Sequence, residues 1–285
     1  MNLLQETKQL CDLYHIKPAR SKGQNFLINS DVYDKIIAEA GLHKDDLVVE
    51  VGPGLGFLTF LLADTVKTVL AVELDQKIVK ALALRLEMND YKNVRLLNAD
   101  VLDFWLLTKL PQEIAKGDYQ VVANLPYNIS SVFLRKFLET PSRPKTMTLM
   151  LQREVAERLT ARPGKMSLLS LSVQFYAEAK LVLRVDKKDF WPEPKVNSAV
   201  VKLITKKQPP LEAGELKAFW RLAKIGFSAK RKMLKNNLAS GLKLDGQTIE
   251  TALAKVGLKS NCRPQDLSLE EWLTLYKNLA RQIII

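Results

Sequence analysis

Short apolar segments and helical segments alternate between residues 46 and 151, and this alternation restricts the fold more than any other feature of the chain. β-branched runs predict strands, while apolar residues at three- and four-residue spacing, as in residues 76–89, predict the helices between them. Such an order is typical of βαβ units and predicts an α/β fold with a mostly parallel, doubly wound sheet. The predicted strands are residues 46–51, 68–73, 94–97, 119–123 and 146–151.

Glycine or polar residues stand where four of these strands end. Gly52 follows the first strand, Glu73 ends the second, Asp100 follows the third and Asn124 follows the fourth. In doubly wound sheets, ligands bind beyond the carboxyl ends of the strands, where the strand order switches. We therefore expect these four residues to belong to one binding site.

A second, smaller domain is predicted at the C-terminal end. Residues 174–184 and 198–205 have the composition of further strands, and the segment K-K-Q-P-P (206–210) is typical of a linker because two prolines do not fit regular structure. The pattern beyond it is helical throughout. We predict a catalytic domain over residues 1–207 and a helical domain over 208–285, with helices at 214–225, 229–240, 247–256 and 268–281.

The net charge of +12 and the pI near 9.5 favour a polyanionic partner, with nucleic acid ahead of an anionic membrane surface. The chain has two histidines and two cysteines, Cys11 and Cys262, with no Cys/His cluster. We therefore expect free thiols in a reducing compartment and no metal site. The apolar runs are too short to span a membrane, so no membrane association is expected.

The segment E-V-G-P-G-L-G (50–56) has a glycine at every second position between a strand and a helix. Such a turn lets the backbone approach a ligand and exposes helix N-terminal amides, although a plain tight turn is equally compatible. The spacing is neither the G-x-G-x-x-G of dinucleotide folds nor a P-loop.

Two carboxylates further along suit an adenosine-containing ligand. Glu73 can accept hydrogen bonds from both ribose hydroxyls, and Asp100 can accept one from an adenine amino group. Read alone, Glu73 is better explained as a solvated acid at a strand end, and Asp100 can be a helix N-cap or turn residue. Together with the glycine turn they favour S-adenosylmethionine over NAD, because no phosphate cradle is present.

At the level of whole motifs, the chain resembles the ribosomal RNA adenine N6-dimethyltransferases from about residue 20 to residue 280. The motifs, in the order of that family, are G-Q-N-F-L (23–27), E-V-G-P-G-L-G-F-L-T (50–59), V-E-L-D (72–75), N-A-D-V-L-D-F (98–104), N-L-P-Y-N-I-S (124–130), F-W-P-E-P-K-V-N-S-A-V-V (190–201) and F-S-A-K-R-K-M-L-K-N-N-L (227–238). N-L-P-Y-N-I-S is more similar to the small-subunit, 16S-type enzymes than to the large-subunit resistance methylases, which tend to carry N-I-P-Y.

The resemblance implies a class I S-adenosylmethionine-dependent methyltransferase whose cofactor site contains Asn25, Leu27, Gly52, Gly54, Glu73, Asp100 and Asn124. Asn25 and Leu27 close over the cofactor, and the glycines lie at its amino-acid end. Glu73 binds the ribose and Asp100 the adenine. Asn124 contacts both the cofactor and the target base.

The turn N-L-P-Y also fits the chemistry of methylation at adenine N6. This amine is a poor nucleophile because its lone pair is delocalised into the ring. The side-chain oxygen of Asn124 and the carbonyl of Leu125 can accept its two N–H groups, while Pro126 rigidifies the turn. Tyr127 offers a face for an extruded base, and Phe190 is expected to cover the other face. Read alone, N-L-P-Y is equally an X-Pro turn with a core tyrosine.

Residues 216–243 contain eight basic residues and no acidic one, with the densest charge at Lys230, Arg231 and Lys232. We expect RNA phosphate contacts there and near Arg20-Ser21-Lys22. The alternative is a solvated helix face. The family often has two arginines in place of Lys230-Arg231-Lys232, a difference that preserves charge but weakens any argument from bidentate contacts.

The resemblance implies a monomeric, cytoplasmic enzyme that dimethylates two adjacent adenosines in a hairpin near the 3′ end of 16S rRNA in the assembling small ribosomal subunit. Three alternatives stay open. The first is a large-subunit rRNA methylase of the antibiotic-resistance type. The second is a mainly non-catalytic assembly or transcription factor on the same fold. The third is a DNA adenine methylase.

Overall fold

The structure is a computed structural model that describes residues 2–18, 24–106 and 110–283. The chain forms two compact units. The first unit comprises Met1–Glu157 and Glu178–Thr205, and the second comprises Arg158–Ala177 and Lys206–Ile285. By packing, residues 158–177 therefore belong with the helical C-terminal part. The functional division at residue 208 stays a prediction.

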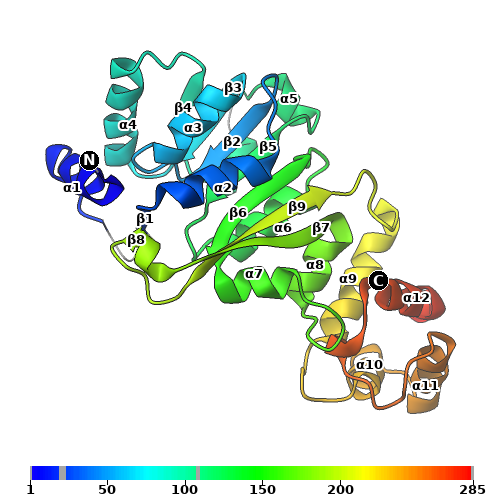
Figure 1. The fold of residues 1–285 in the computed structure, drawn as a ribbon. Coiled ribbons are helices and arrows are strands. Elements are labelled where there is room, and N and C mark those ends of the chain that lie inside the picture. The colour runs from blue at the N-terminus through cyan, green and yellow to red at the C-terminus, as the bar shows by residue number, and fades with distance from the viewer. Residues whose placement is uncertain (1, 19–23, 107–109, 284–285) are drawn as a thin grey trace. The chain divides into compact units, whose positions relative to one another are not determined.

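A seven-stranded sheet in the order β4-β3-β2-β5-β6-β9-β7 organises the first unit (Figure 1). The run from β4 to β6 is parallel, and β9 is antiparallel to β6. All five residues of β2, L-V-V-E-V, are buried, as expected for a parallel strand covered on both faces. The strands are β2 (Leu47–Val51), β3 (Thr68–Glu73), β4 (Val94–Asn98), β5 (Gln120–Asn124), β6 (Thr146–Gln152), β7 (Ala177–Val185) and β9 (Ser198–Thr205).

Helices cover both faces of this sheet. One face packs against α2 and α3 through a cluster that includes Val48, Val69 and Val122. On the other side lies α6, where Phe133 and Phe137 stack with ring centroids 4.2 Å apart (Figure 1). The predicted doubly wound α/β fold is confirmed. The helices that follow α1 are α2 (Ser30–Ala40), α3 (Phe57–Thr65), α4 (Gln76–Met88), α5 (Gln112–Ala115), α6 (Ser130–Glu139) and α7 (Arg153–Leu159), with 3-10 turns at Val101–Leu106 and Lys187–Asp189.

A two-stranded ribbon joins two segments that are far apart in sequence. β1 (Phe26–Leu27) pairs antiparallel with β8 (Phe190–Trp191), so that Leu27 lies opposite Phe190. The N-terminal helix α1 (Leu3–Leu13) precedes this ribbon. The sequence patterns did not predict the ribbon, because two residues are too few for any periodicity.

The second unit is helical, as predicted. Its core is built on aromatic rings, including Phe175 against Phe219 at 5.2 Å and Phe227 stacked on Trp272 at 5.4 Å. The helices are α8 (Leu168–Tyr176), α9 (Ala213–Gly226), α10 (Leu234–Leu242), α11 (Gly246–Lys255) and α12 (Leu269–Leu279), with 3-10 turns at Pro264–Asp266 and Ala280–Gln282. None of the helices within the described residues is long and apolar enough to cross a membrane.

Two predicted boundaries in this part of the chain are wrong. The segment expected as a strand from residue 174 is still helical up to Tyr176. The helix expected from residue 229 begins only at Leu234, so the residues before it form a turn between α9 and α10.

Candidate active site

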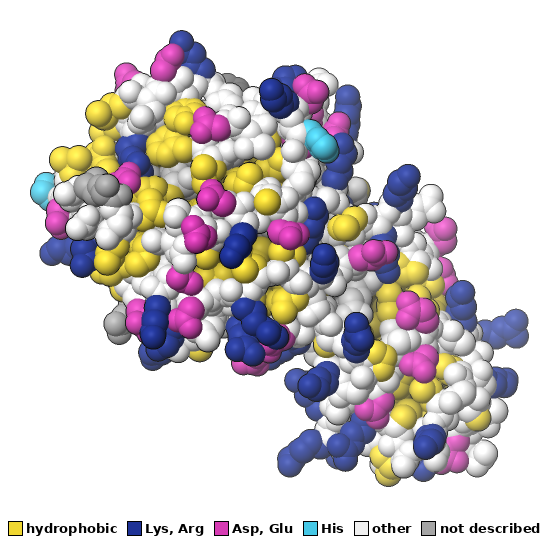
Figure 2. All heavy atoms as spheres, viewed as in Figure 1, with side chains coloured by type: hydrophobic (Ala, Val, Ile, Leu, Met, Phe, Trp, Pro, Cys, Tyr) yellow, Lys and Arg dark blue, Asp and Glu magenta, His cyan; other side chains and the backbone are white. Residues whose placement is uncertain are grey.

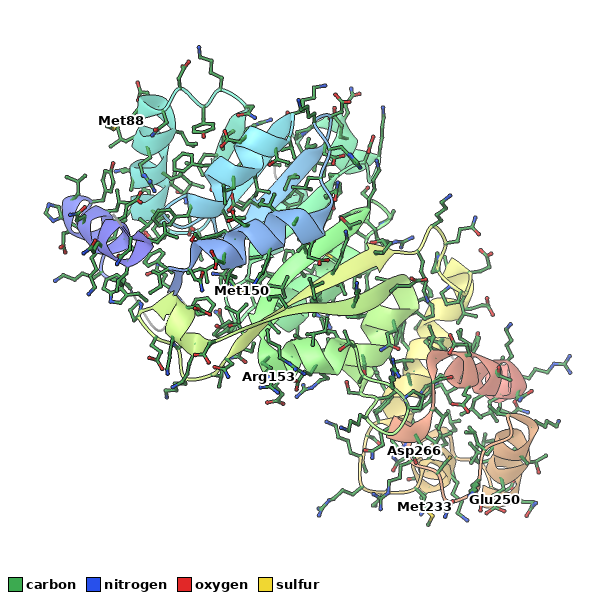
Figure 3. The ribbon with its side chains drawn as sticks, in the orientation of Figure 1. Met88, Met150, Arg153, Met233, Glu250 and Asp266 are labelled. Carbon is green, nitrogen blue, oxygen red and sulfur yellow. The ribbon has the colours of Figure 1, made fainter. Side chains whose placement is uncertain are left out.

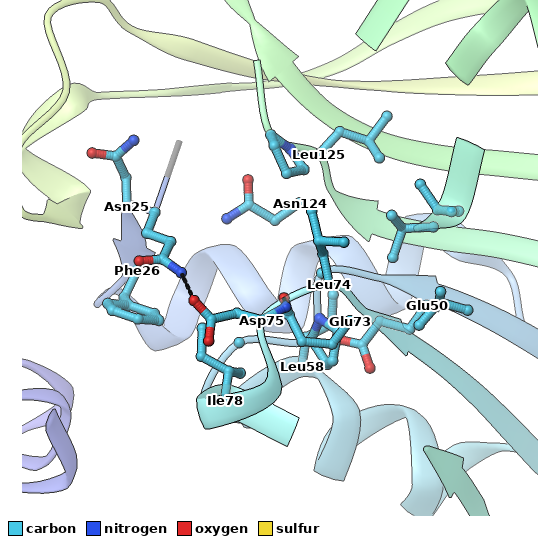
Figure 4. A pocket seen from close by; sticks show the side chains of 18 of the residues that line it. Asn25, Phe26, Glu50, Leu58, Glu73, Leu74, Asp75, Ile78, Asn124 and Leu125 are labelled. Carbon is cyan, nitrogen blue, oxygen red and sulfur yellow. Dashed lines mark hydrogen bonds between the residues drawn. The ribbon is translucent and has the colours of Figure 1, made fainter. Parts of the chain in front are cut away.

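A cavity of about 370 Å³ opens where the strand order switches. β2 lies between β3 and β5, so the chain leaves β2 toward one edge of the sheet and later returns to its other side. The carboxyl ends of β2, β3 and β5 and the residues after β4 line the cavity (Figure 4). It contains all ten residues predicted for the cofactor and the catalytic turn: Asn25, Leu27, Gly52, Gly54, Glu73, Asp100, Asn124, Leu125, Pro126 and Tyr127.

The glycine turn forms the edge of the cavity that follows β2. Gly52, Gly54 and Gly56 have φ values of 66°, 57° and 92°, a region that favours glycine. A Cβ on Gly56 would lie 2.4 Å from a methyl carbon of Leu82, so a side chain does not fit there. Gly52 and Gly54 bring bare backbone to the cavity, and α3 begins directly after the turn.

Two buried carboxyl groups set the electrostatics of the cavity. Glu50 is 1% exposed and Glu73 9%. Burial raises the pKa of Glu50 to about 8; hydrogen bonding to Thr59 opposes this shift, and the neighbouring Glu73 adds to it. Burial also raises the pKa of Glu73, against hydrogen bonds from the backbone of Asp75, Gly54 and Leu74. The shifts record the cost of holding negative charge away from water.

This donor set fits a cationic ligand. Among the described residues that line the cavity, none is Lys, Arg or His. Glu50 Oε2 is buried and makes no well-formed hydrogen bond with the described residues, although the side chain of Thr59 interacts with this carboxyl group. A ligand with a positively charged centre and hydroxyl or amino donors would satisfy these oxygens, whereas phosphate groups would be repelled. The cavity therefore suits the expected S-adenosylmethionine, which carries a sulfonium and an ammonium group.

Both carboxylates predicted to bind adenosine also have structural contacts. Glu73 Oε1 accepts a hydrogen bond from the backbone N–H of Asp75 at 2.8 Å. Asp100 Oδ1 accepts one from the backbone N–H of Leu102 at 2.8 Å. Asp100 is thus a turn residue and a cavity residue at once, so the two interpretations of its sequence position are compatible.

The turn after β5 presents two acceptors that the protein leaves open. Asn124 is the last residue of β5, and the N–H of Leu125 donates to Met150 O at 3.2 Å, which holds the turn to β6. No described residue donates a hydrogen bond to the side chain of Asn124 or to the carbonyl of Leu125. In Figure 4 the Asn124 carboxamide extends into the cavity on the side where Asn25 lies.

Tyr127 is held by a residue that the sequence analysis did not single out. Its hydroxyl lies 2.7 Å from Ser198 Oγ, and Ser198 is fully buried at the start of β9. The hydroxyl of Ser130 donates to the carbonyls of Pro126 and Tyr127, both at 3.3 Å. These contacts give the tyrosine ring a fixed place at the cavity, so it is not a free surface aromatic.

Phe190 lies beside the cavity and does not line it. It is 3% exposed and belongs to the apolar cluster that packs against the sheet. Through the β1–β8 ribbon its backbone pairs with Leu27, which does line the cavity. That Phe190 covers one face of a base stays a prediction.

The predicted cationic residues Lys230, Arg231 and Lys232, here named the basic turn, lie between α9 and α10 in the second unit. All three are exposed, and none forms an ion pair with a described residue. Buried Asn237 anchors the chain just before the basic turn. Its Nδ2 donates to Gly226 O at 2.6 Å and to Ala229 O at 3.1 Å.

Basic and acidic side chains both lie on the visible face of the second unit in Figure 2. Lysine and arginine side chains project along the outline of the second unit (Figure 2), and Met233, labelled in Figure 3, follows the turn. The other predicted phosphate contact, Arg20-Ser21-Lys22, lies outside the described residues.

Comparison with known proteins agrees with this site. The family model for ribosomal RNA adenine dimethylase matches residues 17–281. The chain belongs to the ribosomal RNA adenine dimethylase family. Enzymes of this family are S-adenosylmethionine-dependent methyltransferases, so the predicted family, enzyme class and cofactor are confirmed.

Relatives of this adenine dimethylase match over nearly their whole length. "Ribosomal RNA small subunit methyltransferase A" of Dehalococcoides mccartyi (strain CBDB1) is 41% identical over 276 residues, covering 96% of this chain and 92% of the relative. The protein of the same name from Alkaliphilus oremlandii (strain OhILAs) is 36% identical over 281 residues, covering 98% and 97%.

Two solved structures resemble this chain over most of its length. The 23S rRNA methyltransferase ErmE has a TM-score of 0.74 and 30% identity, covering 90% of this chain and 100% of that one. A dimethyladenosine transferase from Plasmodium falciparum has a TM-score of 0.75 and 26% identity, covering 89% and 97%.

Proposed function

We propose that this protein transfers methyl groups from S-adenosylmethionine to N6 of two adjacent adenosines in a hairpin near the 3′ end of 16S rRNA, during small-subunit assembly. The observation that carries the proposal is the pair of open acceptors, Asn124 and Leu125, at a cavity that contains every predicted cofactor residue. Relatives named small subunit methyltransferase A, 36% to 41% identical over nearly the whole chain, support the choice of subunit.

Each cofactor residue contacts a different part of the methyl donor. Glu73 accepts from the ribose hydroxyls and Asp100 from the adenine amino group, while Asn25 and Leu27 close the cavity over the cofactor. The bare backbone at Gly52 and Gly54 leaves room for the amino-acid end. When bound, S-adenosylmethionine supplies an electrophilic methyl group on its sulfonium sulfur.

The target adenine is held by the turn after β5. Tyr127 stacks against the extruded base, and the two acceptors take the two N6–H groups, which localises the nitrogen lone pair. With the methyl donor bound, that lone pair would attack its methyl carbon, and the sulfur would leave with the electron pair of the S–C bond. The proton then leaves the alkylated nitrogen for water, so positioning is the main contribution of the protein.

Methyl transfer to small subunits that lack dimethyladenosine tests the proposal. With labelled S-adenosylmethionine and mass analysis of the RNA, the wild-type protein should give dimethyladenosine. Asn124→Ala should slow transfer by about 100-fold or more, because it removes one acceptor from the reacting amine. Asn278→Ala, an exposed amide on α12, is the control that should leave the rate unchanged.

The same experiment decides between the remaining alternatives. Transfer only to large-subunit RNA would favour the function named for ErmE, which is 30% identical to this chain. Binding to small subunits without transfer would favour an assembly factor. Transfer to duplex DNA in preference to RNA would favour a DNA adenine methylase.

The RNA partner is assigned to the helical part of the chain. We infer that residues 208–285 bind rRNA through the basic turn, whose three exposed cations have no ion-pair partner among the described residues. We further infer a monomer acting in the cytoplasm, where small subunits assemble. Gel filtration with light scattering tests the oligomeric state directly.

A further inference from the structure

Arg85 connects the glycine turn to the N-terminal helix. It extends from α4, and its side chain is only 12% exposed. Nη1 donates a hydrogen bond to the carbonyl of Leu55 in the glycine turn, and Nη2 donates to Glu6 Oε1 in α1 at 3.1 Å. The guanidinium also lies over the rings of Phe57 and Phe60, at 5.2 and 4.9 Å from their centroids. One partly buried cation therefore contacts α1, the glycine turn and α3.

Helix α1 packs directly behind the cavity wall. Cys11, together with Ile16 just after the helix, forms an apolar cluster with Phe26, Leu55 and Ile78. These last three residues also line the cavity. The N-terminal helix is therefore the outer layer of the proposed cofactor site, although none of its own residues lines the cavity.

Loss of the Arg85 hydrogen bonds should cost stability in this part of the protein. Burial lowers the pKa of Arg85, while the charges of Glu6 and Tyr14 oppose that shift. Removing either hydrogen-bond partner leaves this partly buried charge incompletely solvated, which adds to the loss of the bond itself. Leu55 lies in the glycine turn, where the glycines restrict the backbone little. The hydrogen bond from Arg85 to the Leu55 carbonyl therefore supplies a restraint on the turn that the residues of the turn do not.

We propose that Arg85 is a positioning residue of the methyl-donor site: with Glu6 it docks α1 against the glycine turn, and this docking sets cofactor affinity. The inference rests on the proposed placement of the cofactor in this cavity. Coupling between two sites is reciprocal, so a bound cofactor must also stabilise the docked α1 by the same factor. The role is conformational, since Arg85 itself does not line the cavity.

Calorimetric binding of S-adenosylhomocysteine is the first test. Arg85→Met should lower affinity roughly tenfold, within the usual range of coupling between sites. Arg85→Lys should lie between it and the wild type, since an ammonium can keep one of the two hydrogen bonds but not both. Glu6→Gln should weaken binding less, because it retains an acceptor. Lys80→Met, an exposed cation on the same helix, should bind as the wild type does.

Hydrogen exchange in α1 separates positioning from a merely structural role. S-adenosylhomocysteine should slow exchange of the α1 amides in the wild type, and should do so less in Arg85→Met. The proposal is overturned if Arg85→Met and Glu6→Gln bind within twofold of the wild type, or if the ligand leaves α1 exchange unchanged. If the wild type itself binds no S-adenosylhomocysteine, the proposed cofactor site fails as well, which distinguishes the two failures.

Discussion

The cavity of the first unit and the basic turn of the second unit both use charge, but in opposite physical settings. In the cavity, Glu50 and Glu73 are buried, and their pKa values rise because their charge is held away from water. In the basic turn, Lys230, Arg231 and Lys232 are exposed. Charges in a low-dielectric cavity interact strongly and are screened little, whereas exposed charges interact weakly and are screened by salt.

The difference indicates what each region can recognise. Two buried carboxyl groups near strand ends have fixed positions, so they suit one small ligand of defined shape that offers hydrogen-bond donors and positive charge. Exposed cations adapt to many geometries, and each adds a modest, roughly independent contribution on a polyanion. Cofactor binding should therefore depend on single residues and little on salt. RNA binding should depend on many residues and strongly on salt.

Glu73→Ala should show the largest effect. Its carboxylate is expected to accept two ribose hydrogen bonds, and hydrogen bonds to charged groups contribute about 1.5–3 kcal/mol each, so cofactor affinity should fall by at least about 100-fold. RNA affinity should be unchanged. Calorimetry with S-adenosylhomocysteine and filter binding with rRNA measure the two, and Glu87→Ala, an exposed acid on α4, is the control. A parallel loss of RNA affinity would contradict the separation of the two regions.

The pH dependence of Glu50 sharpens the comparison from the cavity side. Its pKa of about 8 in the folded protein lies above the ordinary value of 4.5. Between these values the folded chain holds a proton that the unfolded chain has lost, so stability falls as pH rises toward 8. For the ligand-free protein the loss attributable to Glu50 should be about 1 kcal/mol from about pH 6 to about pH 7.

Glu50→Gln removes this titration while keeping the shape of the side chain. Urea unfolding of the wild type and the variant across this range measures the effect as the difference between the two stability curves. That difference cancels the contribution of Glu73, whose pKa is also raised. Parallel curves would show that Glu50 does not titrate in this window.

The parts of the fold that the sequence predicts best are those determined locally. The strands at residues 68–73 and 198–205 begin and end where predicted, because each contains a run of β-branched and other apolar residues that is typical of a strand. The start of α8 was missed, because L-L-S-L-S-V-Q-F-Y is equally apolar and only the capping box of Ser167 and Ser170 shows where the helix begins. The basic turn was predicted to be helical. Instead, the side chain of Asn237 donates a hydrogen bond to the carbonyl of Gly226, and the helical structure is interrupted after that residue.

The candidate site divides in the same way. Residues at strand ends could be assigned from the chain alone, because the topology brings all parallel strand ends to one edge. Ser198 and Arg85 could not, since they act through partners 71 and 30 residues away in the sequence. Glu50 did carry a local signal: an acid inside an otherwise apolar strand must be buried, and a buried acid beside a glycine turn is a candidate for ligand binding.

The smallest expected effect belongs to the basic turn. Arg231→Gln removes one of its three cations and should lower rRNA affinity roughly fivefold at moderate salt, while the slope of log affinity against log salt falls by about one unit. Cofactor affinity should be unchanged, because Arg231 belongs to the second unit and does not line the cavity.

Lys277→Gln, which removes an exposed cation from α12, is the matched control and should keep the wild-type slope. If both variants reduce the slope equally, RNA affinity depends on the net charge of the helical unit, and the basic turn is not a specific phosphate contact. If only Arg231→Gln does, the turn that Asn237 anchors is the point of phosphate contact, and buried and exposed charge serve separate ligands in this protein.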